Sequence, residues 1–355
     1  MLQHPKQSTH KFEILPETTT KINYSSYANA INLKKTLIII GTGRKIQVYE
    51  IPYINGEPKQ LKLIQKLKEH SNDVLALQFF NLPQKNDSFV SGAAMVDNSI
   101  IIWSQVQNPN SPIQYGMQYR LKGHQDQVSN LLIHPIREDI IISGSQDSTI
   151  KFWSKDHEWS CQQTMNEFKT AINGMAINNL GDQFVSCSKE KLIIVMRPDQ
   201  QFQWSVKQRI KFPQEVFRLC FITNDLLAIL PHMGTQLHFF AQNEHQHFVK
   251  SLDHLNLATP GEQCFPLFPP CYSPITETLI IKNGNKVNVV KFSFLKSKEG
   301  VQIRESEGGW TCKLEQVIEY VDYFLFGSMS KDGEYLVSYL FDQLSIQIRK
   351  YTMQE

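Results

Sequence analysis

The chain has 355 residues, a formal net charge of +2 and a sequence pI of about 8.1, with 41% apolar and 20% charged residues. This composition is typical of a globular protein, and the length fits one large domain or two ordinary ones. The weak net charge gives no reason to expect nucleic-acid binding. No apolar run approaches the roughly 18 residues of a membrane-spanning helix.

Cysteine usage indicates a reducing compartment. The six cysteines form no C-x-x-C pair, and several lie in strand-like runs, where a free thiol behaves as a small apolar side chain. Residues 1–26 are polar and contain no apolar segment of the signal-peptide type. We therefore expect a cytoplasmic protein, with the nucleus as the alternative location.

The first predicted elements are short strands near the N-terminus. Lys11–Leu15 is a candidate strand, and Leu37–Ile40 and Ile46–Tyr49 are two more. The segment between the last two, Gly41–Lys45, is rich in glycine but lacks the G-x-x-x-x-G-K-[ST] spacing of a phosphate-binding loop. A strand follows it rather than a helix, so a hairpin turn is predicted.

Two longer units follow, and they correspond to each other residue by residue. Lys68-Glu69-His70 opens the first, which ends at Ile102-Trp103-Ser104, and Leu121 to Ser154 forms the second. In the second unit the strands Val128–Ile133 and Ile140–Ser145 are separated by a turn. Strands that alternate with turn clusters at this spacing predict a β-meander rather than a βαβ unit.

The second unit resembles a WD repeat, one blade of a β-propeller, because it has a Gly123-His124 pair and a terminal Trp153, with Ser154 in place of the family's final Asp. The resemblance implies a buried hydrogen-bond chain of His, Ser, Asp and Trp. These residues are His124, Ser143, Asp147 and Trp153 in the second unit and His70, Ser91, Asp97 and Trp103 in the first. An indole only donates, a carboxylate only accepts, and His and Ser do both, so the four groups can satisfy one another in a dry blade.

The same Ser, His and Asp are also the residue types of a hydrolase triad. A nucleophilic serine of that kind lies on an exposed turn, typically within G-x-S-x-G, and no such motif occurs in the chain. Ser143 instead follows Ile140-Ile141-Ile142 in an apolar strand. We therefore expect a structural role for these residues and predict no enzyme activity, catalytic residue, cofactor or metal.

After Ser154 the strand rhythm continues without the full polar set. Ser186 and Glu190 repeat the spacing of Ser143 and Asp147, with Met196 in the Trp position. Three further units are predicted from Val216–Ile222, Leu226–Leu230 and Gln236–Phe240; from Thr278–Ile281 and Val287–Phe292 around the turn Asn283-Gly284-Asn285; and from Tyr320–Phe326, Tyr335–Leu340 and Leu344–Arg349.

These units together imply an all-β fold, a seven-bladed β-propeller of four-stranded antiparallel blades. A single propeller domain is expected over residues 22–355. Residues 1–21 form an N-terminal segment, in which Lys11–Leu15 is the candidate outer strand of blade seven. Pairing the first strand with the last would remove the open seam of an unclosed ring.

Two polar clusters each have two interpretations. His238, His245, His247 and His254 include an H-x-H pair, but the ligand count of a metal site is incomplete, so a polar strand or loop is favoured. Lys282, Lys286, Lys291, Lys296 and Lys298 form a local excess of positive charge. This patch, Lys282–Lys298, is either a phosphate-binding surface, for a lipid headgroup or RNA, or a solvated blade edge.

The segment Cys264–Pro274 is apolar, aromatic and rich in proline, so part of it is predicted to be a rigid loop. Phe265, Phe268 and Tyr272 would suit a partner-binding hot spot on such a loop. They would suit equally well the packing of the inner strand of blade six, and no periodicity separates the two interpretations.

By resemblance, the function expected is that of a non-catalytic scaffold or adaptor subunit that binds other proteins, as a monomeric propeller within a larger complex. The family commonly binds through the face carrying the d–a and b–c loops. The candidate partner-binding residues there are Asn72, Met95, Gln125 and Gln146. The alternatives are phosphate binding by the lysines and, from Glu158-Trp159-Ser160-Cys161, an adaptor similar to the cytosolic iron–sulfur assembly propeller.

Overall fold

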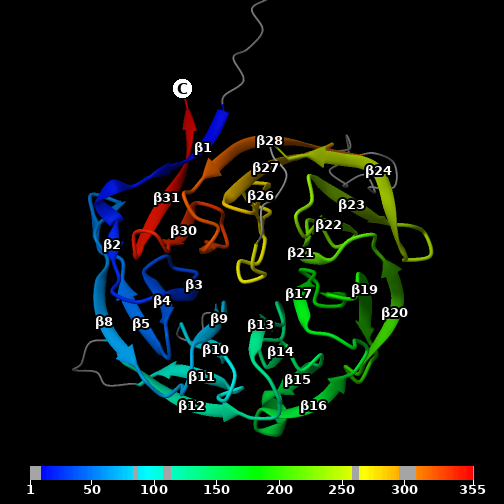
Figure 1. Ribbon diagram of the computed structural model, residues 1–355, viewed down its shortest axis with the longest axis horizontal. Coiled ribbons are helices and arrows are strands. Elements are labelled where there is room, and N and C mark those ends of the chain that lie inside the picture. Colours follow the sequence, from blue (N-terminus) through cyan, green and yellow to red (C-terminus); the bar gives the residue numbers. More distant parts are fainter. Residues whose placement is uncertain (1–8, 83–86, 107–112, 258–263, 296–308, 355) are drawn as a thin grey trace, which may run out of the picture.

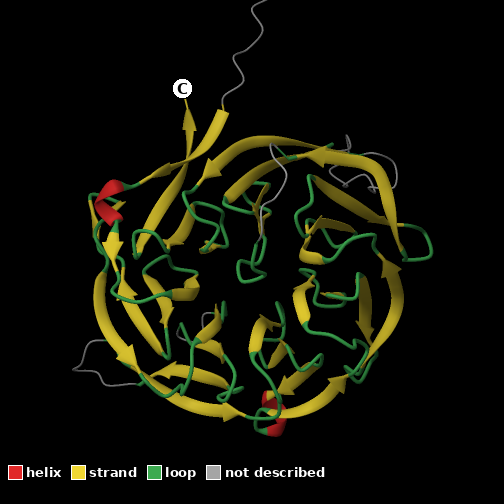
Figure 2. Ribbon diagram, in the orientation of Figure 1, coloured by secondary structure: helices red, strands yellow, loops and turns green. Residues whose placement is uncertain are grey.

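Seven antiparallel sheets stand around a central axis in the computed structural model (Figure 1), which describes residues 9–82, 87–106, 113–257, 264–295 and 309–354. Strands dominate, as Figure 2 shows, and the helical elements within these ranges are the short 3-10 turns η1 (Pro16–Thr18) and η3 (Lys155–His157). The predicted all-β seven-bladed propeller is confirmed. In this part of the chain, no helix is both long and apolar enough to cross a membrane.

Each blade is a four-stranded antiparallel sheet with strands a to d running from the axis outward. The strands of blades one to three are β3 (Ser26–Ile31), β4 (Leu37–Thr42), β5 (Lys45–Glu50) and β8 (Lys62–Leu67); β9 (Val74–Phe79), β10 (Phe89–Ala93), β11 (Ile100–Gln105) and β12 (Tyr115–Leu121); and β13 (Val128–Ile133), β14 (Ile140–Ser145), β15 (Ile150–Ser154) and β16 (Ser160–Met165). A small hairpin of β6 (Tyr53–Ile54) and β7 (Glu57–Pro58) joins strands c and d of blade one.

Blades four to seven have the same order of strands. They are β17 (Ile172–Ile177), β18 (Phe184–Ser188), β19 (Leu192–Pro198) and β20 (Trp204–Lys211); β21 (Val216–Phe221), β22 (Leu226–Pro231), β23 (Gln236–Gln242) and β24 (Phe248–Asn256); β25 (Cys271–Ser273), β26 (Thr278–Asn283), β27 (Lys286–Phe294) and β28 (Trp310–Glu319); and β29 (Leu325–Met329), β30 (Tyr335–Leu340), β31 (Ser345–Gln354) and β1 (Thr9–Ile14).

The ring is closed by strands from its two ends, which lie together in Figure 1. β1 pairs antiparallel with β31, and β2 (Thr20–Lys21) pairs with the same strand. The predicted closing strand Lys11–Leu15 therefore corresponds to β1. Phe12 of β1 is buried, and its backbone N–H and C=O are both hydrogen-bonded by the Gln316 side chain of blade six, at 2.8 and 3.1 Å. β1 therefore closes blade seven by pairing with β31 and also links it to blade six through hydrogen bonds with Gln316.

Burial explains the two kinds of strand pattern. All residues of β14 and β22 are buried, because a middle strand has a neighbouring blade on each face. The outer strand β20 instead alternates between less and more exposed positions, with one face toward solvent. Continuous apolar runs such as Ile140-Ile141-Ile142 therefore belong to strand b.

Glycine allows neighbouring blades to approach closely. Gly92 occupies the same position of strand b as Gly144, and a Cβ added to Gly92 would lie only 2.9 Å from the Val128 carbonyl oxygen of the next blade. The same addition at Gly144 would lie 2.9 Å from Ile172 Cγ2. A side chain at either position would therefore force the two blades apart.

The strand predicted over Tyr320–Phe326 is placed differently. Strand a of blade seven is β29 (Leu325–Met329), and the residues before it form the loop that follows β28. Strand a of blade six, β25, contains only three residues, because the proline-rich segment before it forms a loop. Both departures lie at the junction of blades six and seven.

Closure predicts a stability difference within β1. Phe12→Ala should destabilise the protein by about 3–5 kcal/mol, because a buried aromatic ring is lost. Ile14→Ala is the matched control in the same strand; since Ile14 is exposed, its replacement should cost under about 1 kcal/mol. Denaturant melts measure both changes. Equal effects would show that the seam does not depend on this ring.

Candidate functional site

The four polar residues of blade three form a continuous hydrogen-bond chain. Trp153 Nε1 donates to Ser143 Oγ at 2.8 Å, Ser143 Oγ lies 2.7 Å from His124 Nε2, and His124 Nδ1 lies 2.8 Å from Asp147 Oδ2. Because the carboxylate only accepts, His124 donates from Nδ1 and accepts at Nε2. The order of donation is therefore Trp, Ser, His, Asp, and the imidazole and indole are buried.

Blade two repeats this geometry. Trp103 Nε1 lies 2.8 Å from Ser91 Oγ, Ser91 Oγ lies 2.7 Å from His70 Nε2, and His70 Nδ1 lies 3.1 Å from Asp97 Oδ2. Arg120 adds a guanidinium at 3.5 Å from the other oxygen of the Asp97 carboxylate. We call each set of four residues a tetrad.

Each tetrad also holds a loop. Asp147 Oδ2 accepts the backbone N–H of Gln125 at 2.9 Å, and Oδ1 accepts the Thr149 hydroxyl at 2.6 Å. Burial alone would raise the pKa of Asp147, but hydrogen bonds from His124, Thr149 and Gln125 hold it well below its usual range. The carboxylate is therefore ionised in the folded state and fixes the d–a loop before β13.

In the described residues of the other blades, apolar packing or isolated polar contacts take the place of this chain. In blade four, Met196 is buried in the Trp position, and Ser186 Oγ donates only to Gly174 O, at 3.3 Å. Glu190 does not reach Ser186; it accepts the N–H groups of Lys169 and Thr170 in the preceding loop. In blade one, the Tyr49 hydroxyl in the Trp position donates to Gln47.

The tetrads have no accessible nucleophile. Ser143 is fully buried, and its hydroxyl already accepts from Trp153 and contacts His124. Trp159, in the segment with the faint adaptor resemblance, is also buried and packs against Phe80 with ring centroids 6.3 Å apart. These side chains are parts of the core rather than of a surface site.

Partner-binding candidates from the two regular blades lie at one end of the propeller. The strands run antiparallel, so d–a and b–c loops share one end of every blade, which we call the upper face. Met95 is 58% exposed in a b–c turn, and Asn72 Nδ2 donates to its carbonyl at 2.7 Å. Gln125 is exposed and Gln146 is half-buried in the equivalent loops of blade three.

The proline-rich segment contributes one exposed ring to this face. Phe265 is 41% exposed, whereas Phe268 is 1% exposed and packs in the core of blades six and seven. The burial of Phe268 favours the packing interpretation over that of an exposed partner-binding residue. Tyr272, in β25, packs edge-on against Phe292 at 5.7 Å, as expected for an inner strand.

Phe265 belongs to a group of rings that we call the aromatic cluster: Phe265, Tyr323, Phe324 and Phe341. Phe265 lies 5.2 Å from Phe324 and 6.4 Å from Tyr323, and Phe324 lies 5.2 Å from Phe341, between ring centroids. The rings come from the d–a loops before β25 and β29 and from the b–c turn after β30. Only Phe265 of these rings was singled out from the sequence, because the apolar run containing Tyr323 and Phe324 resembles a strand and Phe341 stands alone in a turn.

Two buried cations support the aromatic cluster. Lys282 is fully buried, and its ammonium donates to Tyr323 O at 2.7 Å and to Leu325 O at 2.8 Å. Arg218 of β21 is also buried, and its Nη2 donates to Phe265 O at 2.9 Å. The loops that carry the rings are therefore fixed from below by side chains of blades five and six.

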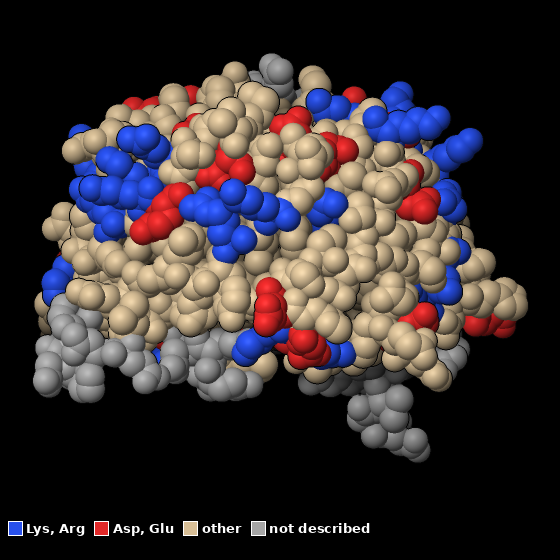
Figure 3. All heavy atoms as spheres, turned by 90° about the horizontal axis from the view of Figure 1, so that it is seen from below, with Lys and Arg blue, Asp and Glu red and all other residues tan. Residues whose placement is uncertain are grey.

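The described lysines of the Lys282–Lys298 patch are buried or paired with carboxylates, so they do not favour a phosphate-binding surface. Lys282 is interior, Lys286 lies 3.6 Å from the Glu319 carboxylate, and Lys291 lies 3.6 Å from that of Glu277. Lys296 and Lys298 lie outside the described residues. Figure 3 shows the opposite side of the ring from blade six, where basic side chains gather in several groups with acidic ones between them.

The histidines of blade five do not converge. His238 and His254 face each other across β23 and β24, but His245 and His247 lie in the exposed turn between those strands. Over the described ranges, no group of three or more His, Cys, Asp or Glu residues is arranged to hold a metal ion.

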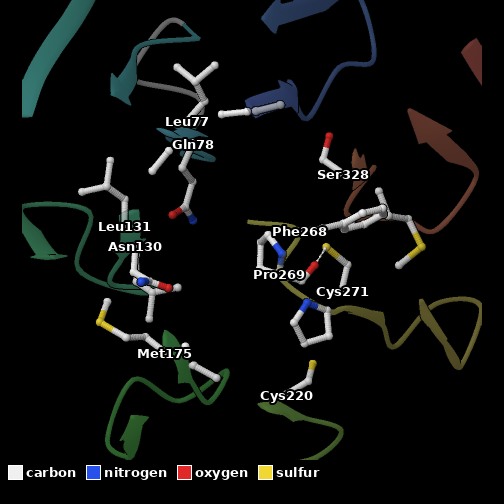
Figure 4. Close-up of a pocket in the computed structure, with 18 of the residues that line it drawn as sticks. Leu77, Gln78, Asn130, Leu131, Met175, Cys220, Phe268, Pro269, Cys271 and Ser328 are labelled. Carbon is white, nitrogen blue, oxygen red and sulfur yellow. Dashed lines mark hydrogen bonds between the residues drawn. The ribbon is translucent and has the colours of Figure 1, made fainter. Parts of the chain in front are cut away.

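The central channel is a cavity of about 410 Å³ lined by the inner strands of the blades. Figure 4 shows Leu77, Leu131 and Met175 on one side of it and Phe268 and Pro269 on the other. The proline-rich segment therefore narrows the channel. The lining is mostly apolar, with amide side chains such as Gln78 and Asn130, and it includes none of the tetrad residues.

The comparison with protein families identifies two repeats. A family model described as "WD domain, G-beta repeat" matches residues 61–104 and 116–154. Each match covers one outer strand and strands a to c of the following blade, so together they contain both tetrads. No curated protein matches the chain.

The tetrad geometry predicts that equivalent serines differ in importance. Ser143→Ala should cost about 2 kcal/mol or more, because it leaves the Trp153 N–H and the His124 Nε2 buried without a partner. Ser186→Ala, the position-matched control in blade four, should cost under about 1 kcal/mol, since only one hydrogen bond is lost. Urea melts compare the two. A cost for Ser143→Ala no larger than for Ser186→Ala would contradict the tetrad's role.

The ionised Asp147 predicts a pH dependence. Its pKa is lowered in the folded state, so its stabilising contribution is present above the unfolded pKa of about 4 and is lost as the pH falls below that value. Asp147→Asn should therefore destabilise the protein by roughly 1–3 kcal/mol at pH 7, with the difference from wild type shrinking toward pH 3. Asp253→Asn, in the exposed part of β24, is the control. A difference independent of pH would refute this assignment.

Proposed function

We propose that this chain, a WD-repeat protein with a seven-bladed propeller fold, acts as a non-catalytic scaffold or adaptor that binds another protein through its upper face. The aromatic cluster is the anchor of that contact, and the turns with Met95 and Gln146 form a second part of the same face. The proposed partner presents an apolar side chain to the cluster.

The observation that carries this proposal is the group of rings around Phe265. Aromatic residues supply large contact areas with few rotatable bonds, and they dominate binding energy at the centres of protein interfaces. Four such rings meet at the end of the propeller where three connections from two blades come together. Their loops are held by Arg218 and Lys282, so little conformational entropy is lost when a partner binds.

The non-catalytic part of the proposal is supported by what surrounds the polar side chains of the repeats. The hydroxyls of Ser91 and Ser143 are fully buried and hydrogen-bonded to indoles, so neither is available to a substrate. A rigid ring of strands with its polar networks turned inward is suited to presenting a surface rather than to assembling a reaction centre.

Affinity purification with identification of the co-purifying proteins tests the proposal. Phe265→Glu should lower recovery of the specific partner by about tenfold or more, because a charge must then be desolvated in an apolar contact. Phe202→Glu is the matched control. The exposed fraction of Phe202, 37%, is similar to that of Phe265, but Phe202 lies in a c–d loop at the opposite end of the propeller. The Phe202→Glu variant should recover as much of the partner as the wild-type protein does.

Met95→Glu and Gln146→Glu form the second arm of this experiment. If these variants lose the partner while Phe265→Glu recovers it normally, the contact lies on blades two and three of the same face. Equal recovery by all four folded variants would contradict binding by the upper face altogether.

A further inference from the structure

A buried cluster beneath the aromatic cluster has an excess of positive charge. Arg218 and Lys282 are both buried there, and a buried cation without a counter-charge is costly. Cys264, Arg218 and Asp322 are the ionisable groups that act on Lys282, and the charge of Arg218 acts in turn on Cys264 and His232. Neither cation makes an ion pair within 4.0 Å of a carboxylate among the residues that the structure describes.

The side chain that touches both cations is Cys264. Arg218 Nη2 donates to Cys264 Sγ at 3.1 Å, and the Lys282 ammonium is near enough to the same sulfur to interact with it electrostatically. The same Nη2 atom donates to Phe265 O. A thiolate at this position would offset one of the two positive charges and would be a stronger acceptor for Arg218 Nη2 than a neutral thiol is.

Electrostatics favour ionisation of this thiol over the others. Burial alone would raise the pKa of Cys264, but Arg218 and Lys282 together lower it below its usual value. Burial lowers the pKa of Lys282 to about 8, an effect that the adjacent sulfur opposes. By contrast, burial raises the pKa values of Cys187, Cys220, Cys271 and Cys312.

We propose that Cys264, held between Arg218 and Lys282, is a reactive thiolate and a site of oxidation by hydrogen peroxide. The sulfur attacks one peroxide oxygen, so that an S–O bond forms while the O–O bond breaks. Sulfur loses two electrons and becomes a sulfenic acid, and the peroxide is reduced. The departing hydroxide takes a proton from the Lys282 ammonium and leaves as water. Cys264 is 6% exposed, which limits the site to small reagents.

The position of this cysteine connects its chemistry to the upper face. Arg218 links the sulfur to the backbone of Phe265, so an added oxygen displaces the guanidinium that fixes this loop. Any effect on partner binding rests on the proposed function, whereas the reactivity of Cys264 does not. The two proposals can therefore fail separately.

Alkylation of the native protein tests the thiolate. Iodoacetamide is applied from pH 5.5 to 9, and the label on each of the six cysteines is measured by mass spectrometry. Cys264 should reach its half-maximal rate about one pH unit or more below the ordinary thiol value of about 8.5, and Arg218→Gln or Lys282→Gln should raise that midpoint by about one unit. Cys161 is the exposed control and Cys187 the buried one. After peroxide treatment, dimedone should label Cys264.

Several results would overturn the proposal. One is a folded protein in which Cys264 stays unlabelled up to pH 9 while Cys161 reacts completely. Others are a pH profile for Cys264 equal to that of Cys161, or a dimedone adduct on Cys161 alone. Circular dichroism identifies any variant that fails to fold, and in that case the wild-type pH profile decides.

Discussion

Closure of the ring is the constraint on which the rest of the structure depends. Only β1 completes blade seven, and it does so from residues 9–14, more than 300 positions away from its partner strand β31. Gln316 then fastens the backbone of Phe12 to blade six. Because every blade packs between two others, this one long-range pairing completes the packing at the seam between the two ends of the chain.

Within the closed ring, neighbouring blades are matched by shape more than by polar chemistry. The tetrads occur in blades two and three, yet the middle strands of the other blades are equally buried. Gly92 and Gly144 leave room for the first strand of the following blade, and in blade four Cys187 takes the equivalent position and reaches Val216 O, at 3.1 Å. Close packing therefore tolerates loss of the tetrad wherever apolar residues such as Met196 fill its volume.

The sequence predicted most of the architecture because strand periodicity survives where the tetrads do not. Strands b and c were predicted by range in blades one, five, six and seven, and β1 was predicted as the closing strand. Two predictions failed because each was based on local residue composition alone. Tyr320–Phe326 was assigned to a strand because an apolar loop has the same composition, and Lys282 was placed on the surface because lysine is rarely buried. Only the folded structure shows that the Lys282 ammonium contacts the backbone of the loop that contains Tyr323.

The two halves of the ring support their upper loops with charges of opposite sign. In blades two and three, the carboxylates of Asp97 and Asp147 accept backbone N–H groups of the preceding loops. Near blades six and seven, Lys282 and Arg218 instead donate to loop carbonyls. Each buried carboxylate accepts hydrogen bonds from the imidazole of its own tetrad and from the loop, whereas neither cation has a carboxylate within 4.0 Å among the residues that the structure describes.

The sulfur of Cys264 occupies the place where that balance is needed. This sulfur accepts from Arg218 Nη2 at 3.1 Å, and it also interacts electrostatically with Lys282. A counter-charge supplied by a thiolate differs from one supplied by a carboxylate, because the sulfur can be oxidised and alkylated. The loss of tetrads in this half of the propeller therefore has a chemical consequence: the loops that carry the aromatic cluster depend on a group whose charge can be changed covalently.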